Sequence, residues 1–129
     1  MVTAISLMKR DLAKVAHSAT VLDAAKMMRE RKIGSVFIAQ NERIVGIVTE
    51  ADIVRRSVGV GHMPGFIAVS TIMSSPVIGI EGGRPITEAA DLMERSQTRH
   101  LAVMQSGDIV GVLPVRDCFT LSPLTNFEP

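Results

Sequence analysis

Apolar and polar residues follow two kinds of pattern along the chain, and the patterns occur twice in the same order. Apolar runs of strand length lie at 12–15, 36–39 and 44–48, and again at 77–80, 101–104 and 109–113. Between the first two runs of each set, apolar residues recur at i, i+3, i+4 and i+7, the spacing of one helix face. These positions are Val21, Ala24, Ala25 and Met28, then Ile86, Ala89, Ala90 and Met93. Each set therefore predicts strand, helix, strand, strand and a closing helix.

Turn residues and helix-start residues divide these patterns into elements. The segments 40–43 and 105–108 join the last two strands of each set and contain Asn or Gly, which favours hairpins. The helices are predicted to begin near Thr20, Thr49, Pro85 and Pro114. A threonine hydroxyl can cap a helix, and proline suits the first helical turn.

The two sets align without a gap at an offset of 65 residues, so the chain contains an internal repeat. We place the first repeat at 7–56, an inter-repeat connection at 57–71, the second repeat at 72–119 and a C-terminal tail at 120–129. Gly59, Gly61 and Pro64 interrupt the pattern in the connection. A unit of this size has too small a core to be stable alone. We expect an α/β (α+β) fold of two small three-stranded units, packed about a pseudo-twofold axis that creates two related clefts.

The apolar surface of the predicted helices is wider than one sheet would cover. Leu22 and Met27 lie outside the stripe of the first helix and widen its apolar arc to roughly 220°; Leu92 widens that of the second. A second buried contact is needed, and a partner subunit is its simplest source. We therefore expect a homodimer formed partly through helices.

Composition excludes several classes of protein. Apolar residues make up 47% of the 129 residues, and fourteen basic against thirteen acidic side chains leave a net charge of +1. Such a balance provides no field to attract nucleic acid or a membrane. No run of 18 or more apolar residues occurs, the first ten residues lack a signal-peptide layout, and one cysteine cannot form an internal disulfide. We expect a cytoplasmic protein.

The strongest candidate for ligand chemistry is the junction where strand 44–48 meets the next helix, with Thr49 and Asp52 in a Thr-x-x-Asp motif. The structural interpretation is a capping box, and Thr20 and Asp23 show the same spacing where no ligand is expected. The functional interpretation is nucleotide binding, because a helix N-terminus attracts phosphate and a carboxylate can accept ribose hydroxyl protons. In the second repeat Asp117 persists, whereas Pro114 replaces the threonine. We expect the first site to bind more tightly.

The remaining charged residues, the cysteine and the histidines are weaker candidates for a functional site. Arg99 and His100 start a strand of the second repeat, where they form either a solvated strand end or a phosphate clamp. Arg55 and Arg56 indicate a solvated helix end or, as the weaker alternative, a contact with a phosphate. Cys118 corresponds to Ile53 in the first repeat, which indicates a structural cysteine rather than a nucleophile. His17, His62 and His100 have no ligand spacing, so we expect no metal site.

The repeated order, the motif from Gly46 to Asp52 and the Arg99-His100-Leu101 strand start together resemble a tandem pair of cystathionine beta-synthase (CBS) domains. The likeness covers Leu7 to Phe119. We identify no enzyme, channel or transporter domain beside the repeats in this sequence, so the likeness is to the stand-alone bacterial and archaeal type. The resemblance implies a sensor that binds an adenosine nucleotide between its repeats and performs no catalysis. Departures from the family's pattern are Pro114 for threonine or serine, Ala51 for arginine and Ala102 for proline.

The resemblance predicts a regulatory module that binds AMP, ADP or ATP, requires no cofactor or metal, and signals to an unknown regulated protein. Its binding residues would be Thr49, Asp52, Asp117, Arg99, His100, Gly34, Ser35, Val15 and Ala16. Gly34 and Ser35 would let the ligand approach closely, and Val15 or Ala16 would pack against the base. Two alternatives remain. In the first, the chain is a structural or protein-interaction module without ligand, and its Thr-x-x-Asp motifs are only helix caps. The second, a nucleotide-directed enzyme, lacks a convincing base or nucleophile.

Overall fold

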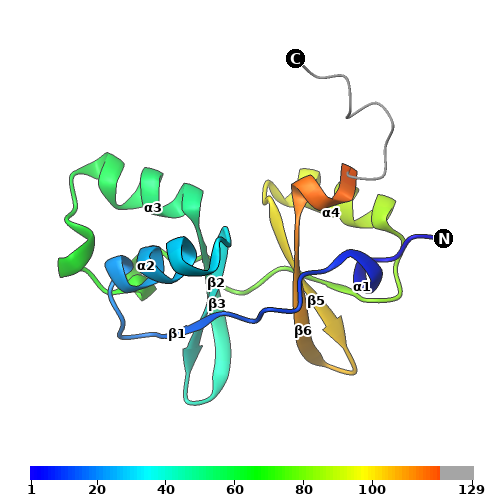
Figure 1. Ribbon diagram of the computed structural model, residues 1–129, viewed down its shortest axis with the longest axis horizontal. Coiled ribbons are helices and arrows are strands. Elements are labelled where there is room, and N and C mark those ends of the chain that lie inside the picture. Colours follow the sequence, from blue (N-terminus) through cyan, green and yellow to red (C-terminus); the bar gives the residue numbers. More distant parts are fainter. Residues whose placement is uncertain (120–129) are drawn as a thin grey trace. The chain divides into compact units, whose positions relative to one another are not determined.

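The computed structural model describes residues 1–119, and these form parts of two compact units (Figure 1). One unit contains Leu12–Val77. The other combines Met1–Asp11 with residues 78–119. The tail predicted at 120–129 lies outside the described residues.

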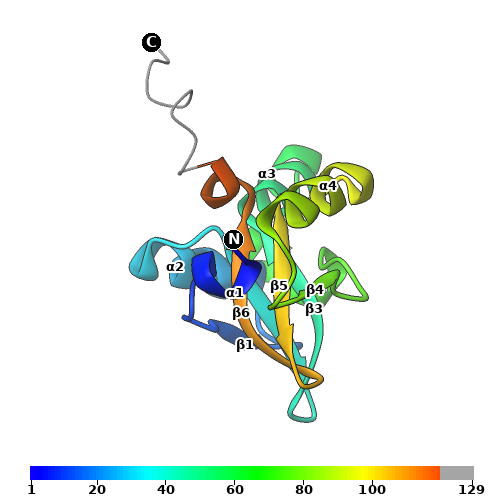
Figure 2. The same ribbon diagram turned by 90° about the vertical axis from the view of Figure 1, so that its right-hand side faces the viewer.

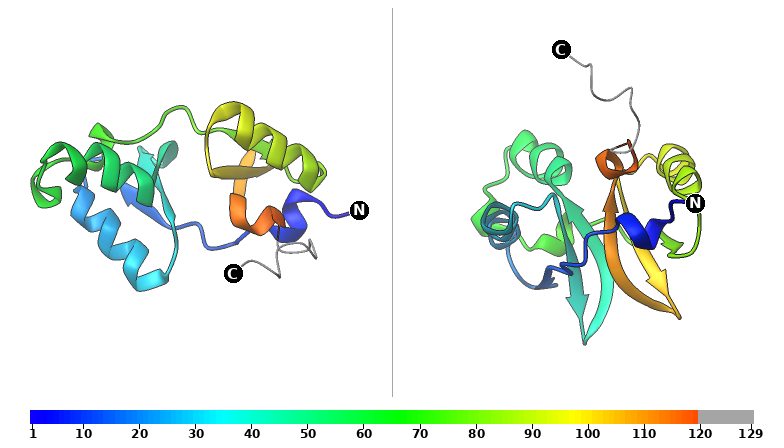
Figure 3. Two further views of the ribbon diagram at one scale, coloured as in Figure 1. Left: turned by 90° about the horizontal axis from the view of Figure 1, so that it is seen from above. Right: turned by 45° about the vertical axis from the view of Figure 1, so that its right-hand side comes forward.

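The unit formed by Leu12–Val77 is a small sheet with two helices on one face (Figures 1 and 3). Its sheet has the order β1-β2-β3, in which β1 is parallel and β3 antiparallel to the central strand β2. The elements are β1 (Lys14–Ala16), α2 (Val21–Arg31), β2 (Ser35–Gln40), β3 (Arg43–Thr49) and α3 (Glu50–Arg56). Three short 3-10 helices follow: η1 (Val58–Val60), η2 (Pro64–Phe66) and η3 (Val69–Thr71).

The other unit repeats this plan, with the sheet order β4-β5-β6 and the same strand directions. The short helix α1 (Ala4–Leu7), from the start of the chain, contacts β4 and β6 (Figure 2). The remaining elements are β4 (Gly79–Glu81), α4 (Ile86–Ser96), β5 (His100–Gln105), β6 (Asp108–Pro114) and the 3-10 helix η4 (Val115–Phe119).

Strand register confirms the internal repeat. Lys14 pairs with Phe37, and Gly79 pairs with Ala102, which are the same positions after the offset of 65. Both hairpins also carry an irregularity at the same place, between Ile38 and Ala39 and between Val103 and Met104. The predicted hairpins are therefore equivalent, and the mixed α/β fold is confirmed.

Each unit has its own core of aliphatic and methionine side chains. The core of the first is built from Ala13, Val15, Val21, Ala24, Met28, Val36, Ile38, Val48, Val69 and Ile72. That of the second is built from Ala4, Met8, Ile80, Ala89, Met93, Leu101, Val103 and Leu113. The predicted helix stripes supply Val21, Ala24 and Met28 to one core, and Ala89 and Met93 to the other.

The segment that precedes each repeat packs onto the strands of the other repeat. Lys9 bridges to Val112 in one unit, and the equivalent residue Ser74 bridges to Ile47 in the other. The close approach requires glycine: a Cβ on Gly111 would collide with the Sδ of Met8, and one on Gly46 would lie 2.6 Å from the Sδ of Met73. The two compact units therefore do not follow the two sequence repeats.

Three local features differ from the pattern-based expectations. Helix α1 lies in a segment with no helical periodicity. The closing helix of the second repeat is the 3-10 helix η4 within the described residues, where the first repeat has the α-helix α3. Pro85 is the N-cap residue of α4 rather than a member of its first turn. Among residues 1–119, no helix has the length and apolar character needed to cross a membrane.

Part of the second contact predicted for the wide apolar arc comes from the chain itself. The side chain of Met27 is half-buried against the core of its own unit. Leu22 lies near η2, with its Cδ2 3.6 Å from where a Cβ on Gly65 would be, yet it remains 40% exposed. Leu92 packs partly against its own core. The homodimer stays a prediction.

Candidate functional site

The turn from β3 into α3 holds Thr49 and Asp52 in a reciprocal capping box. The Asp52 backbone N–H donates to Thr49 Oγ1 over 3.2 Å, and the Thr49 N–H donates to Asp52 Oδ2 over 2.9 Å. Extended backbone at Thr49 turns the chain into the helix and aims its hydroxyl at the first turn. Local sequence therefore suffices to build this junction.

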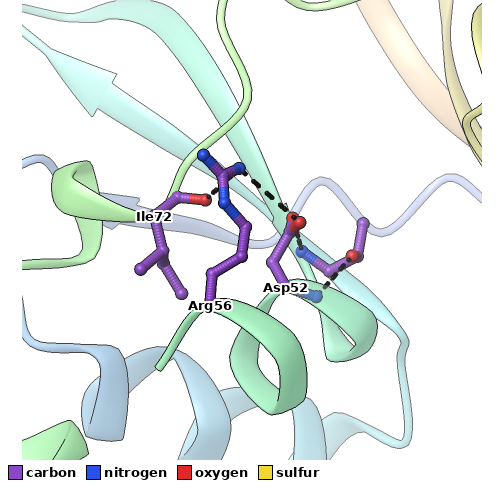
Figure 4. Close-up of polar contacts among 4 residues, drawn as sticks. Asp52, Arg56 and Ile72 are labelled. Atoms are coloured by element: carbon purple, nitrogen blue, oxygen red, sulfur yellow. Dashed lines mark hydrogen bonds and ion pairs between the residues drawn. The ribbon is translucent and has the colours of Figure 1, made fainter. Parts of the chain in front are cut away.

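The second carboxylate oxygen of Asp52 faces a basic side chain. Arg56, one turn further along α3, brings Nη1 to 3.8 Å from Asp52 Oδ1 and donates from the same atom to the carbonyl of Ile72 over 2.9 Å (Figure 4). The Asp52 side chain keeps 18% of its surface exposed. It is thus oriented from both sides but remains accessible. The i, i+4 spacing from Asp52 to Arg56 is a sequence signal for this pair, which the interpretation of Arg56 as a solvated helix end or a weaker phosphate contact does not include.

Gly34 and Ser35 lie beside this junction, as the predicted site requires. Ser35, nearly buried, starts β2 and pairs with Thr49 across the sheet. The carbonyl of Gly34 accepts the N–H of Glu50 over 3.0 Å, so the first residue of α3 is tied to the turn before β2. The structure brings Gly34, Ser35, Thr49 and Asp52 together in one unit.

The equivalent junction of the second repeat keeps the same backbone hydrogen bond and strand pairing but has different side chains. The N–H of Val115 donates to the carbonyl of Arg99 over 2.7 Å, and His100 pairs with Pro114. Asp117 has Lys9 as an ion-pair partner, with 3.6 Å between Nζ and Oδ2. No pattern in the sequence indicated Lys9, because it belongs to the N-terminal segment. Arg99, His100 and Asp117 therefore gather around one junction in this unit.

The two residues expected to contact a base differ in exposure. Val15 is 9% exposed and belongs to the core of its unit, whereas Ala16 is exposed. The β1 strand alternates exposed, buried, exposed, which is the geometry of a half-covered strand. Of the pair, Ala16 is the residue that a ligand can reach.

The capping box at the start of α2 provides an internal reference. The Asp23 backbone N–H donates to Thr20 Oγ1 over 3.1 Å, and the Thr20 N–H donates to Asp23 Oδ2 over 3.0 Å. These hydrogen bonds, the backbone one foremost, lower the pKa of Asp23 from its ordinary value. Because this box matches that of Thr49 and Asp52, capping by itself accounts for the observed geometry at both places.

Nucleophilic and metal chemistry find little support. Burial, and secondly the charge of Asp117, raise the pKa of the Cys118 thiol, which reduces its thiolate fraction and its nucleophilicity. Its side chain packs against the core of its unit. Within residues 1–119, no group of three or more His, Cys, Asp or Glu side chains is placed to hold a metal ion.

Comparison with known proteins identifies the family. The family model for the CBS domain matches twice, at residues 2–59 and 69–123, which together span most of the chain. The chain belongs to the CBS domain family. The second match begins at Val69, inside the connection that we placed between the repeats.

Individual relatives have the same residue as this chain at about a quarter to a third of the aligned positions. A structure from Burkholderia ambifaria, a candidate signal-transduction protein with CBS domains, is 28% identical, with a TM-score of 0.87 over 99% of this chain and 98% of that one. A hexameric CBS-CP12 protein from bloom-forming cyanobacteria is 28% identical, with a TM-score of 0.88 over 97% and 73%. An uncharacterized protein of Methanopyrus kandleri is 32% identical, over 89% of this chain and 60% of the relative. The chain spans about three fifths of the length of that relative.

Proposed function

We propose that this CBS pair is a regulatory, non-enzymatic module that binds an adenosine nucleotide, AMP, ADP or ATP, at its Thr-x-x-Asp junction and transmits occupancy to a partner protein. The observation that carries the proposal is the convergence of Thr49, Asp52, Gly34 and Ser35 at one partly exposed helix start. The family match and the signal-transduction description of the Burkholderia relative agree with a sensor.

The junction retains the groups that such a ligand needs. The Thr49 hydroxyl accepts the Asp52 N–H and still has its own proton to donate to a phosphate or ribose oxygen. Each oxygen of the Asp52 carboxylate can accept more than one hydrogen bond, so a ribose can be bound beside the existing partners. Displacing Arg56 from Asp52 would release a cation for the phosphates. In this proposal the ligand changes what Arg56 contacts, which links occupancy to the segment around Ile72.

A second function has an observation in its favour. In a structural or protein-interaction module, Thr49 and Asp52 would serve only to cap α3, as Thr20 and Asp23 cap α2. The matching geometry of the two boxes supports this alternative, because α2 starts where we expect no ligand. The two functions differ in whether Asp52 binds a ligand in addition to capping its helix, whereas Asp23 only caps.

Calorimetric titration with AMP, ADP and ATP distinguishes the two. We expect Asp52→Ala to lose roughly 1.5–3 kcal/mol of binding free energy, one to two decades in affinity, because a charge-assisted contact to the ribose disappears. Asp117→Ala should lose less, since Pro114 offers neither a hydroxyl nor an N–H at that junction.

Asp23→Ala is the matched control, because it removes the same kind of cap and should leave affinity unchanged. Equal losses from Asp52→Ala and Asp117→Ala would refute the inequality of the two junctions. A parent protein that binds none of the three nucleotides, with no rise in melting temperature, would leave the interaction module as the function.

We also propose that the chain forms a homodimer through its helices. The cyanobacterial relative is hexameric, so oligomers occur among similar proteins. In this chain, Leu22 stays exposed on α2 after the core has formed, and Val54 on α3 is 62% exposed.

A further inference from the structure

The turn from β6 into η4, the second junction, differs in charge from the turn from β3 into α3, the first junction. Four side chains around the second junction can carry a positive charge, and the positions related to them by the offset of 65 residues are all uncharged. The four are Lys9, Arg99, His100 and Arg116, and their counterparts are Ser74, Gly34, Ser35 and Ala51. Both junctions keep the carboxylate, as Asp117 and Asp52. The second junction is therefore basic where the first is polar.

Strand pairing places two of these side chains on one face of the β4-β5-β6 sheet. Lys9 and Val112 exchange both backbone hydrogen bonds, over 2.8 and 3.0 Å, so their side chains leave the strands on the same side. Pro114, two residues after Val112, lies on that side too, and its partner on β5 is His100. The residues of β5 and β6 that line the core of the unit occupy the opposite face. Lys9 and His100 therefore flank β6 on the face away from that core.

The other two basic residues lie at the start of η4. The carbonyl of Arg99 accepts the N–H of Val115, the first residue of η4, over 2.7 Å, and Arg116 is the next residue and is exposed. Lys9 reaches the same turn, because its Nζ lies 3.6 Å from Asp117 Oδ2. The Lys9 side chain nevertheless keeps 44% of its surface exposed, so a dissolved ligand can reach its charge. Basic groups from two separate parts of the sequence thus meet around one carboxylate.

Linked phosphates are the ligand groups that match this surplus of positive charge. Guanidinium, ammonium and imidazolium groups all donate hydrogen bonds to phosphate oxygens, and each additional phosphate brings further negative charge and further acceptors. At the first junction, Arg56 is engaged by Asp52 and by the carbonyl of Ile72. The first junction therefore has less positive charge to offer a chain of phosphates.

We propose that the second junction selects ligands with two or more linked phosphates, and that Lys9 and Arg116 provide this selection. The ligand is either a nucleoside di- or triphosphate or an inorganic polyphosphate, since both carry the same phosphate chain. The inference rests on the proposed function, in which both junctions bind ligands, and it assigns a ligand class to the second one. It agrees with the smaller loss expected from Asp117→Ala, because the basic side chains rather than the carboxylate hold such a ligand.

Calorimetry with AMP, ATP and tripolyphosphate tests the selection in the Asp52→Ala chain, in which ligand binding at the first junction is weakened. We expect ATP to bind this chain on the order of a hundredfold more tightly than AMP, because two further phosphates contact basic groups. Adding Lys9→Ser and Arg116→Ala, to residues of the types found at the equivalent positions, should reduce the preference to about threefold. High ionic strength should also reduce it, because these side chains are exposed.

The matched control is Lys26→Ser with Arg43→Ala, which removes the same two charges from exposed positions of the other unit. It should keep the preference for ATP, and circular dichroism should show all variants folded. Equal affinities for AMP and ATP in the Asp52→Ala chain, or a preference that survives Lys9→Ser with Arg116→Ala, would overturn the selection. An equal loss in the control would overturn it too, because the effect would then follow net charge.

The three ligands also separate this inference from the proposed function. Tripolyphosphate that binds as tightly as ATP would identify an inorganic phosphate chain as the ligand of the second junction, whereas weaker binding would identify a nucleotide. A parent chain that binds AMP, with no preference for ATP at the second junction, would overturn the selection alone. A parent that binds tripolyphosphate through Lys9 and Arg116 but binds no nucleotide would overturn the proposed function alone. A parent that binds none of these ligands would overturn both.

Discussion

The two units share strand order and register but start their helices by different means. In the unit of Leu12–Val77, α2 and α3 both begin at a threonine, Thr20 and Thr49, whose hydroxyl accepts a backbone N–H. In the other unit the equivalent residues are Pro85 and Pro114, which have neither a hydroxyl nor an N–H. The same fold is therefore compatible with two kinds of helix start.

The acidic residue three positions later changes partner accordingly. Asp23 and Asp52 accept hydrogen bonds from the backbone of their threonines. Glu88 instead accepts from Arg84, through Nε over 2.7 Å and through Nη2, and Asp117 has Lys9 as an ion-pair partner. A carboxylate near a helix N-terminus is favourable in either case. An acidic residue is thus common to all four helix starts, whereas the group that orients its carboxylate differs between the two units.

Both units have a glycine, Gly111 or Gly46, where the segment that precedes one repeat packs onto a strand of the other repeat. Replacing this glycine should have the largest effect on stability. A Cβ on Gly111 would lie 2.8 Å from the carbonyl oxygen of Lys9 and collide with Met8, so Gly111→Ala should cost about 2–3 kcal/mol of unfolding free energy. Gly46→Ala should cost about 1–2 kcal/mol, because the backbone oxygen of Ser74 is 3.0 Å away. Urea unfolding measures both. Gly83→Ala is the control, since nothing lies within 4 Å, and a comparable loss there would contradict the steric explanation.

The next effect separates the two kinds of helix start. Thr49→Ala removes the acceptor of the Asp52 N–H and should lower the free energy of unfolding by about 1 kcal/mol. Thr87→Ala removes an exposed threonine from the first turns of α4, where it caps nothing, and should cost nothing because alanine is the better helix former. Equal effects in chemical denaturation would show that the hydroxyl of Thr49 does not contribute through capping.

A smaller effect concerns Asp23, which accepts a hydrogen bond from the backbone N–H of Thr20. Its contribution to stability should depend on pH. Hydrogen bonds from Thr20 lower the pKa of Asp23 below its ordinary value of 3.8. Its stabilisation is therefore fully present above pH 3.8 and disappears as the pH falls through the lower, folded-state pKa. Asp23→Asn should destabilise the protein at neutral pH and should have no effect in strong acid. Asp108→Asn, at an exposed hairpin position, serves as the control in melting curves recorded across pH.

The smallest effect belongs to the exposed ion pair of the other unit. The hydrogen bond and charge of Arg84 lower the pKa of Glu88, but both side chains are largely solvated. Glu88→Gln should therefore lower the melting temperature slightly at low ionic strength and not at all at high ionic strength, because salt screens exposed pairs. A loss independent of salt would mean that Glu88 stabilises α4 by something other than its charge.

Short-range patterns accounted for the elements around the site. Thr49 and Asp52 are three residues apart, and Gly46 to Val48 form a buried strand before them, so capping and strand formation follow from neighbours in the chain. The offset of 65 residues predicted equivalent hairpins because each copy had to satisfy the same pairing.

Contacts between distant segments were decided only by the tertiary structure. Residues 2–11 and 67–76 are equivalent by the same offset, so nothing local indicates which sheet each one joins; each packs onto the strands of the other repeat. That exchange places Lys9 beside Asp117 and the carbonyl of Ile72 beside Arg56. It also explains why α1 was missed, since four residues are too few for a periodic pattern and this helix is stabilised by its contacts with β4 and β6.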